Sequence, residues 1–295
     1  MNGVLVVNKP GGVTSHDVVA RVRRIAKERS VGHLGTLDPM ATGVLPLLLG
    51  RMTRLAQFYD SSEKAYEGEI RFGFATDTYD AMGEPLAPPQ PFAASLEQVQ
   101  ALARRYQGRF EQMPPPFSAK KIAGVPAYKL ARKKKEVPLK PVEVEIKELE
   151  ITGLEGERAS FRARVATGTY LRSVAHDLGR DLGAGAHLSR LVRTAVGEFS
   201  LTEAKSLEEL EAAFQAGEAG SVLVHPRRIL PQLPSVTATD ESVARIRHGQ
   251  AVNLPEMSRA KEVKVFHGQT DLICIAHRVA GTLFHPRVVL VGGCD

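Results

Sequence analysis

One short segment of the sequence, residues 31–45, carries the most informative chemistry. It reads VGHLGTLDPMATGVL and places a single carboxylate, Asp38, among glycines and next to a proline. His33 lies five residues before it, and the nearest other acidic residues along the chain are Glu28 and Asp60. A solitary acid on a stiff loop suits a nucleophile or a base, whereas a metal site would need several ligands. An aspartate before proline is also typical of a turn, so the local pattern leaves a structural role open.

Other residue patterns offer weaker chemistry. His33 has no His-x-x-x-His or Cys-His companion, so it suits a base, a contact to a nucleotide or a single turn hydrogen bond better than a metal ligand. The run Ser15-His16-Asp17 has the residue types of a catalytic triad, but triads assemble in space and not in series, so a helix cap is favoured. No Gly-x-Ser-x-Gly elbow or phosphate-loop motif occurs, and the glycines at 183–187 do not follow a predicted strand, so nucleotide cofactors are disfavoured.

An arginine stands at a predicted strand-to-helix junction, in the run GTYLR at residues 168–172. Arg172 in that place can face a cleft, pair with a buried carboxylate and hold that carboxylate ionised. It can equally be a surface arginine on the first turn of a helix. The local sequence does not decide between the two.

The positive charge of the chain is concentrated in one segment. The net charge is +6, and residues 117–140 hold eight Lys or Arg against one Glu, so the rest of the chain is close to neutral. A localised cationic strip is what phosphate binding needs, because counterion release grows with the number of phosphates contacted. A solvated loop without a ligand is the alternative, and charge alone does not separate the two.

Composition bounds the class of protein. The 295 residues suffice for one large domain or for a large and a small one, and 43% of them are hydrophobic and 24% charged, as in ordinary globular proteins. The longest apolar run, residues 44–49, contains a proline and is too short to span a bilayer. The N-terminus lacks the pattern of a signal peptide. Two cysteines without a Cys-x-x-Cys motif favour a reducing, cytoplasmic compartment.

The elements that must position these residues are predicted from periodicity. Strands are expected at residues 3–8, 44–49, 66–74, 142–152 and 158–166, the last two as a hairpin. Helices are expected from Thr14 to about Glu28 and at residues 53–59, 95–106, 171–182 and 206–216. Loops are expected at residues 82–94 and at the three prolines 114–116. Strict βαβ units are missing, so we predict an α+β fold with a mixed, mostly antiparallel sheet flanked by helices.

A second, smaller unit is expected after a proline-rich linker at residues 226–234. A short helix at residues 239–248 and three strand-like runs predict a small β-barrel; the runs are 263–266, 272–276 and 287–291. The predicted division is a first domain over residues 1–230 and a second over residues 235–295.

Taken together, the motifs resemble those of the TruB family of tRNA pseudouridine synthases. Six stretches match family motifs in the right order: residues 8–17 (NKPGGVTSHD), 32–45 (GHLGTLDPMATGVL), 114–121 (PPPFSAKK), 128–132 (YKLAR), 168–172 (GTYLR) and 183–188 (GAGAHL). The second is the family's catalytic motif, and the third and fourth belong to its RNA-clasping insertion, here about residues 114–140. Leu34 and Lys134 depart from the pattern, since the family more often has a small or polar residue and a glycine at these places.

The resemblance implies a fold, a reaction and a substrate. The fold would be that of pseudouridine synthases, with a PUA-like RNA-binding barrel at the C-terminus, which the run RIRHGQAV at residues 245–252 resembles. The reaction would isomerise uridine to pseudouridine at position 55 in the T-loop of tRNA, on a base brought out of its stack. It involves no net redox change, so no cofactor is expected. We expect a cytoplasmic monomer that binds the T-arm of tRNA, with no membrane association and no obligate protein partner.

The resemblance also assigns roles to residues. Asp38 would be the catalytic carboxylate, the nucleophile, which attacks the base, attacks the ribose or assists glycal formation. Arg172 would keep Asp38 charged in a desolvated pocket, and Tyr66 would stack on the flipped uracil with its hydroxyl in range of a proton transfer. The implied substrate-binding residues are Tyr66, His33, Tyr170, Leu191 and Lys9. The implied contacts to the RNA backbone are Lys120, Lys121, Arg132, Lys133, Lys134 and Lys135. No metal ligands are implied.

Other functions stay open on the sequence. A non-catalytic RNA-binding or RNA-folding protein would use the same basic segment and terminal barrel, but it would not need Asp38, Tyr66 and Arg172 around one cleft. A metal-dependent nuclease would need two or more clustered acids near Asp38, and the segment offers one. A guide-RNA-dependent enzyme of the same superfamily would carry extra segments.

Overall fold

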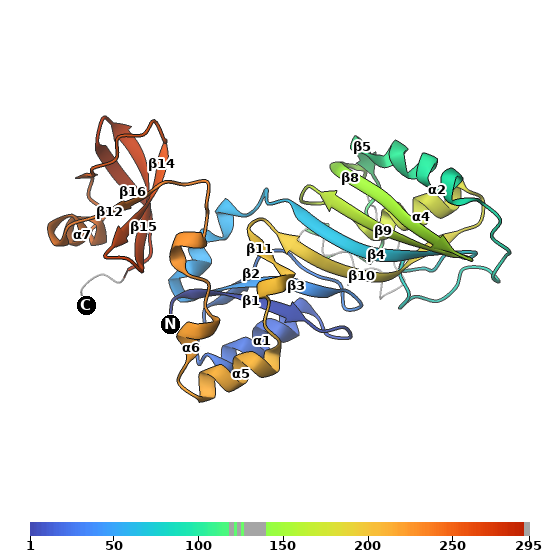
Figure 1. The fold of residues 1–295 in the computed structure, drawn as a ribbon, viewed down its shortest axis with the longest axis horizontal. Coiled ribbons are helices and arrows are strands. Elements are labelled where there is room, and N and C mark those ends of the chain that lie inside the picture. The colour runs from blue at the N-terminus through green and yellow to red at the C-terminus, as the bar shows by residue number, and fades with distance from the viewer. Residues whose placement is uncertain (118–120, 123–124, 127–139, 292–295) are drawn as a thin grey trace.

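A large sheet runs through the centre of the molecule, and a second, smaller sheet lies at the end that holds the C-terminus (Figure 1). The computed structural model describes residues 1–117, 121–122, 125–126 and 140–291. Within these residues the large sheet has nine strands and the smaller one five. The large sheet consists of two parts that carry different pieces of the candidate site.

The first part of the large sheet is built by the N-terminal segment. Its strands are β1 (Gly3–Lys9), β2 (Val31–His33) and β3 (Thr42–Leu49), and β3 pairs antiparallel with both of the others. Helix α1 (Ser15–Ile25) starts at a capping box, in which the Asp17 backbone N–H donates to Thr14 Oγ1 and the Thr14 N–H donates to the Asp17 carboxylate. The helix ends before the expected Glu28, because Lys27 has the left-handed φ of 48°.

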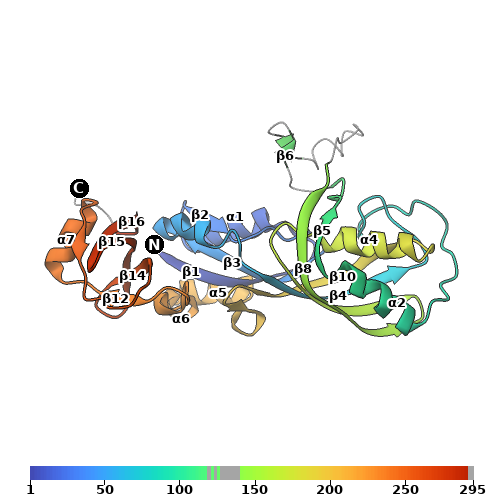
Figure 2. The same ribbon diagram turned by 90° about the horizontal axis from the view of Figure 1, so that it is seen from above.

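The second part of the large sheet is a curved antiparallel array. Its strands, in spatial order, are β10 (Ala186–Val196), β4 (Lys64–Phe72), β9 (Arg158–Val165), β8 (Val142–Glu155) and β5 (Gly108–Gln112). The short strand β11 (Phe199–Ser200) pairs with the end of β10 and is the ninth strand of the large sheet. Helices α2 (Leu96–Ala103) and α4 (Leu171–Asp181) contact each other and pack on this array (Figure 2). The start of α4 is fixed by Gln112, whose side-chain amide exchanges two hydrogen bonds of 3.0 and 2.9 Å with the backbone of Tyr170.

The two parts meet at a short parallel joint between β3 and β10, which consists of the pairs Val192↔Thr42 and Arg193↔Gly43. It is the one parallel strand pair of the large sheet within the described residues. Gly43 has a φ of 100°, and a Cβ at this position would lie 2.3 Å from the Arg193 carbonyl oxygen. Glycine is therefore required for the two backbones to approach each other here.

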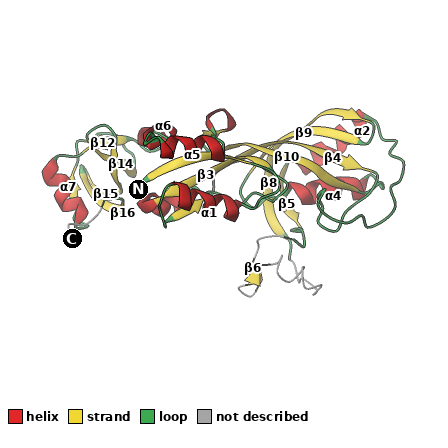
Figure 3. Cartoon of the chain, turned by 90° about the horizontal axis from the view of Figure 1, so that it is seen from below, coloured by secondary structure: helices red, strands yellow, loops and turns green. Residues whose placement is uncertain are grey.

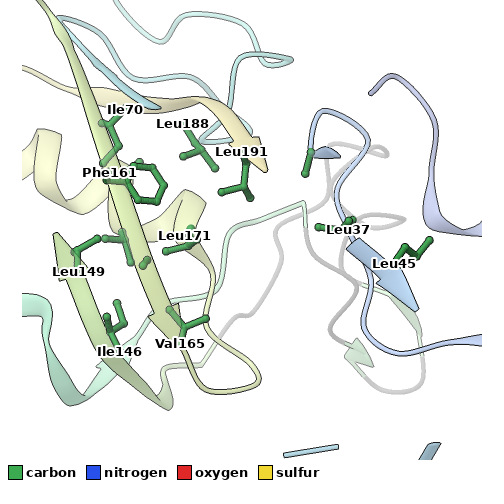
Figure 4. Close-up of a cluster of buried hydrophobic side chains, with 14 of the residues drawn as sticks. Leu37, Leu45, Ile70, Ile146, Leu149, Phe161, Val165, Leu171, Leu188 and Leu191 are labelled. Carbon is green, nitrogen blue, oxygen red and sulfur yellow. The ribbon is translucent and has the colours of Figure 1, made fainter. Parts of the chain in front are cut away.

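One apolar cluster spans the joint. It includes Leu37 and Leu45 from the first part and Leu171, Leu191 and Phe161 from the second, all of them buried. Figure 4 shows Leu37 and Leu45 on the ribbon of the N-terminal segment and the others on the strands and helix of the second part. Burial of this cluster favours one relative position of the two parts, since side chains in a protein core are close-packed.

The smaller sheet follows a linker. Its strands, in spatial order, are β12 (Ser235–Thr237), β14 (Glu262–His267), β15 (Asp271–Ala280), β16 (Leu283–Val289) and β13 (Val252–Asn253), with helix α7 (Asp240–Arg247) beside them. Phe266, Ile275 and Val288 of this sheet share a buried cluster with Val4 and Leu55 of the N-terminal segment. The smaller sheet is thereby packed against the first part of the large one.

Short elements complete the fold. These are the 3-10 helices η1 (Gly50–Phe58), η2 (Arg104–Tyr106), η3 (Leu201–Glu203) and η4 (Pro226–Arg228), the helices α5 (Leu207–Gln215) and α6 (Ala219–Val222), and the strands β6 (Lys121–Ile122), β7 (Val125–Pro126) and β11 (Phe199–Ser200). Strand β6 projects from the body of the molecule, below β8 and β5 in Figure 3, and it pairs with β7. None of the helices in the described part of the chain has the length and apolar character needed to cross a bilayer.

The α+β prediction, with a mostly antiparallel sheet, is confirmed. The long central strand β10 was not predicted, because bulges between Leu188 and Arg190 and between Arg193 and Ala195 interrupt its alternation of apolar and polar residues. The helix expected at residues 53–59 corresponds to the 3-10 helix η1 (Gly50–Phe58), and the last strand begins at Leu283 rather than at residue 287. The domain division at residues 230–235 and the PUA-like character of the C-terminal unit stay predictions.

Candidate active site

The loop that carries Asp38, residues 34–41, joins β2 to β3 and is held along most of its length. The buried hydroxyl of Ser15, at the start of α1, accepts from the Leu37 N–H at 2.8 Å and donates to the Leu37 carbonyl at 3.1 Å. The Pro39 carbonyl accepts from the Gly12 N–H at 2.8 Å and from Lys9 Nζ at 3.3 Å. These bonds fix the backbone on both sides of Asp38, so its carboxylate is presented by a rigid loop.

Asp38 faces two cavities. A first cavity of about 240 Å³ is lined by Asp38 together with Tyr66, Leu191, Tyr170 and Arg172. A second cavity of about 650 Å³ lies on another side of Asp38. One third of the Asp38 side chain is exposed, 33%, so the carboxylate is reachable from these cavities and is not sealed in the core. The first cavity is smaller than the roughly 300–1,000 Å³ of sites for drug-sized ligands, which suits a single nucleoside.

Arg172 forms an ion pair with Asp38. It lies on the first turn of α4 and is 4% exposed. Its Nη2 donates to Asp38 Oδ1 at 3.0 Å, and its Nε lies 2.8 Å from Asp38 Oδ2. The guanidinium also donates to the carbonyl oxygens of Thr78 at 3.0 Å and Phe117 at 2.9 Å. Of the two readings that the local sequence left open, this geometry agrees with the one in which Arg172 faces a cleft and pairs with a carboxylate.

A second carboxylate, which the sequence reasoning missed, lies on the other side of the same arginine. Asp80 Oδ2 is 3.5 Å from Arg172 Nη1, and the Asp80 side chain is 7% exposed. Asp38 therefore has no acidic neighbour within its own sequence segment, as expected, but in the folded chain Asp80 contacts the same arginine. No periodicity marks Asp80, since it comes from the irregular loop after β4 and meets Asp38 only through the fold.

The pKa of Asp38 is displaced upward. Burial is the largest cause and Asp80 adds to it, whereas Arg172 and Lys9 lower the pKa of the same carboxyl. The exposed part of the side chain faces cavities within the protein, so its hydration is incomplete. Arg172 therefore limits the rise and does not reverse it, and its role in keeping Asp38 charged stays a prediction.

The first cavity brings together side chains from separate elements. Tyr66 lies on β4 and Leu191 on β10, while Tyr170 precedes α4. Burial raises the pKa of the Tyr66 hydroxyl, and the neighbouring Arg193 opposes this rise. Apolar, aromatic and charged groups around one small space are typical of a pocket for a planar polar ligand.

Lys9 and His33 occupy different places from these residues. Lys9 is fully buried and its Nζ donates to the carbonyl oxygens of Pro10 at 2.8 Å and Val13 at 2.7 Å, besides Pro39. It lines neither cavity, so the structure gives it a supporting position behind the Asp38 loop. His33 lines the second cavity, burial lowers its pKa, and its Nδ1 has no hydrogen-bond partner within the described residues.

Further side chains near Asp38 escaped the sequence reasoning. Lys64 lines the first cavity and donates to Thr167 Oγ1 at 3.2 Å, and burial lowers its pKa to about 8. Arg193 lies buried beneath the Asp38 loop. Neither residue lies in a predicted strand or a recognised motif, so no sequence signal marked them as buried near Asp38.

The basic segment falls mostly outside the described residues. Lys120, Arg132, Lys133, Lys134 and Lys135 all lie there, as does Cys294, and of Lys121 only the place in β6 is described. Cys274 is buried. In the described ranges no three His, Cys, Asp or Glu side chains are grouped in a way that could hold a metal ion.

Comparisons with known proteins cover almost the whole chain. A model of the TruB family pseudouridylate synthase N-terminal domain matches residues 23–171, and one of the tRNA pseudouridylate synthase B C-terminal domain matches residues 172–231. A protein named tRNA pseudouridine synthase B from Solibacter usitatus is 47% identical over 98% of this chain and 100% of its own length. One of the same name from Geotalea uraniireducens is 40% identical over 91% of this chain and 87% of its own.

Solved structures resemble the fold. A chain in the crystal structure of a Cbf5-Nop10-Gar1 complex superposes with a TM-score of 0.72 at 24% identity, over 98% of this chain and 85% of that one. A chain in the structure of an H/ACA RNP bound to a substrate RNA that contains 2′-deoxyuridine gives 0.71 at 23% identity, over 98% of this chain and 85% of that one. At these identities the likeness establishes the fold alone.

Proposed function

The chain belongs to the TruB family of pseudouridine synthases, and on this premise we propose that it isomerises the uridine at position 55 in the T-loop of tRNA to pseudouridine. The observation that carries the proposal is the Asp38 carboxylate, held by a rigid loop against Arg172 at the wall of a nucleoside-sized cavity. The names of the relatives support tRNA as the substrate.

In the proposed reaction the C1′–N1 glycosidic bond breaks and a C1′–C5 bond forms. One proton leaves C5 and one is gained at N1, so atoms and charge balance without a cofactor. The target base is flipped out of the RNA and enters the first cavity, at a cost of a few kcal/mol that contacts elsewhere must offset. Tyr66 and Leu191 pack against the base there.

Asp38 acts in its ionised form in this proposal. It attacks the base, attacks C1′ or assists a glycal route, and a negative charge is needed in each. Arg172 orients the carboxylate by two contacts, and Asp80 holds Arg172 from the other side. Because both carboxylates contact the same guanidinium, Arg172 occupies the space in which a nuclease would need its metal ion.

Binding energy for base flipping comes from the RNA backbone. We assign phosphate contacts to Lys120, Lys121, Arg132, Lys133, Lys134 and Lys135 in the basic segment, because its cluster of positive charge suits a polyanionic backbone. The C-terminal unit is proposed as a second, PUA-like RNA-binding surface. We further propose that the protein is cytoplasmic and that it acts as a monomer without a protein partner.

One assay tests the function. The purified chain is incubated with a T-arm stem-loop and with an anticodon stem-loop of matched length, and pseudouridine is mapped by mass spectrometry. We expect pseudouridine at the T-loop site and none in the other RNA. Binding of the T-arm without pseudouridine would instead favour the RNA-folding alternative, and modification of both RNAs would contradict the proposed site.

A further inference from the structure

Arg193 stands out among the buried side chains. It lies on β10, is 0% exposed and belongs with Lys9 to the largest fully buried residues. Its Nε donates to the Val44 carbonyl at 2.7 Å, its Nη2 to the Gly35 carbonyl at 2.9 Å and its Nη1 to the Thr36 carbonyl at 3.3 Å. Val44 lies on β3 and the other two acceptors lie in the Asp38 loop between β2 and β3, whereas Arg193 lies on β10 in the second part of the sheet.

These hydrogen bonds cross the joint on which the site depends. The Asp38 loop comes from the first part of the sheet, and Tyr66, Leu191 and Arg172 come from the second. The backbone pairing across the joint consists of only two residue pairs. Arg193 adds three side-chain hydrogen bonds there. Two of them bind the Asp38 loop, at the carbonyls of Thr36 and Gly35, two and three residues before Asp38.

The charge of Arg193 is not used in an ion pair with an acid. Within the described part of the chain no carboxylate lies within 4.0 Å of its guanidinium. A buried cation is costly unless carbonyls or charges compensate it. The compensation here comes from three carbonyl oxygens, the neighbouring Tyr66 hydroxyl and, at longer range, Asp38. In some proteins a buried ionic group of this kind fixes one arrangement of its surroundings.

We propose that Arg193 is a positioning residue, which locks the Asp38 loop to β10 and so sets the distance of Asp38 from Tyr66 and Arg172. The inference rests on the proposed function of the first cavity. Three different nitrogens of the guanidinium, Nε, Nη1 and Nη2, make the three hydrogen bonds. A lysine carries its three donors on the single atom Nζ, so Arg193→Lys keeps the charge but not this spread of donors. The lock therefore depends on the shape of the side chain as well as on its charge.

The test compares Arg193→Lys with Arg190→Lys. Arg190 lies on the same strand and is exposed, so it controls for the substitution itself. Folded fraction is measured by circular dichroism, stem-loop affinity by filter binding, and the chemical step by single-turnover pseudouridine formation. We expect Arg193→Lys to fold and bind RNA as the natural chain does, and to lose about 100-fold in single-turnover rate, as a small misplacement of a reacting group does. Arg190→Lys should keep the natural rate.

A second variant separates positioning from general damage. Arg193→Gly should regain part of its rate when guanidinium ion is added, and not when sodium or ammonium is added at the same concentration. Natural rate in Arg193→Lys would overturn the inference, as would a lysine variant that fails to fold, since Arg193 would then serve the fold and not the site. Absence of pseudouridine with the natural chain would contradict the proposed function instead.

Discussion

Asp38 and Arg172 meet across the joint between the two parts of the large sheet, with Arg172 Nε 2.8 Å from Asp38 Oδ2. The acid comes from a loop of the N-terminal segment and the arginine from α4, 134 residues further along the chain. Their contact exists only when both parts of the sheet are docked. The integrity of the site is thereby coupled to the core cluster that spans the joint.

Replacing Arg172 should impair the chemical step more than RNA binding. In Arg172→Met the Asp38 carboxylate loses its cationic partner, so its pKa rises further and the acid limb of the rate profile moves to higher pH. Single-turnover rates between pH 5 and 9 measure this, and at neutral pH we expect a loss of about 100-fold or more. An unchanged acid limb would show that Arg172 does not act on Asp38. Arg180→Met, an exposed arginine of the same helix, is the control.

Replacing Asp80 should shift the same limb in the opposite direction. The negative charge of Asp80 raises the pKa of Asp38. Asp80→Asn removes that charge, so Asp38 becomes the one carboxylate of the two that still pairs with Arg172, and its pKa should fall. The acid limb is therefore expected at lower pH than in the natural chain, with RNA affinity unchanged. A shift to higher pH in this variant would mean that Asp80 mainly orients Arg172 and that its charge matters little.

Lys9 should contribute to stability in a pH-dependent way. Burial lowers its pKa to about 8, against an unfolded value near 10.5, so the unfolded chain binds more protons between these pH values. The free energy of unfolding of the natural chain should therefore rise from pH 8 to pH 10.5 through this group, and in Lys9→Met this increment should be absent. Urea unfolding at several pH values measures it; identical pH profiles of the two proteins would refute it.

The same substitution should cost stability at neutral pH. Lys9→Met leaves the carbonyl oxygens of Pro10, Val13 and Pro39 without this donor, and an unsatisfied buried acceptor costs about 1–3 kcal/mol. The urea midpoint should fall accordingly, and the single-turnover rate should fall with it because the Asp38 loop loses one of its anchors.

The basic segment should determine the salt dependence of RNA binding. Changing Lys133, Lys134 and Lys135 together to Ala should weaken affinity for the T-arm. It should also flatten the plot of log affinity against log salt by about 0.7–0.9 for each phosphate contact that is lost. The single-turnover rate at saturating RNA should stay close to natural. A salt slope equal to that of the natural chain would remove these lysines from the interface.

Much of this architecture could be predicted from residue patterns. The capped helices at Thr14, Ser95 and Ser206 and the hairpin of β8 and β9 follow local rules of capping and alternation, and these predictions are confirmed. The central strand β10 could not be found in this way, because its bulges interrupt the alternation of apolar and polar residues. In addition, one of its buried positions is occupied by an arginine, Arg193.

The site residues that lie in sequence motifs could be predicted, and those that reach the site only through the folding of the chain could not. Asp38 and Arg172 stand in short, recognisable runs. Asp80 and Arg193 do not, since each acts through a contact with a segment more than ninety residues away, and nothing in the local sequence reports such a contact.

The most direct test of the central claim is the single-turnover rate of Asp38→Asn on the T-arm stem-loop, with binding measured on the same preparation. The substitution keeps the shape of the side chain and removes its charge. We predict that the stem-loop binds as tightly as to the natural chain and that no pseudouridine forms above background. Substantial turnover by this variant would contradict the account, because the carboxylate of Asp38 would then not be the group that carries the reaction.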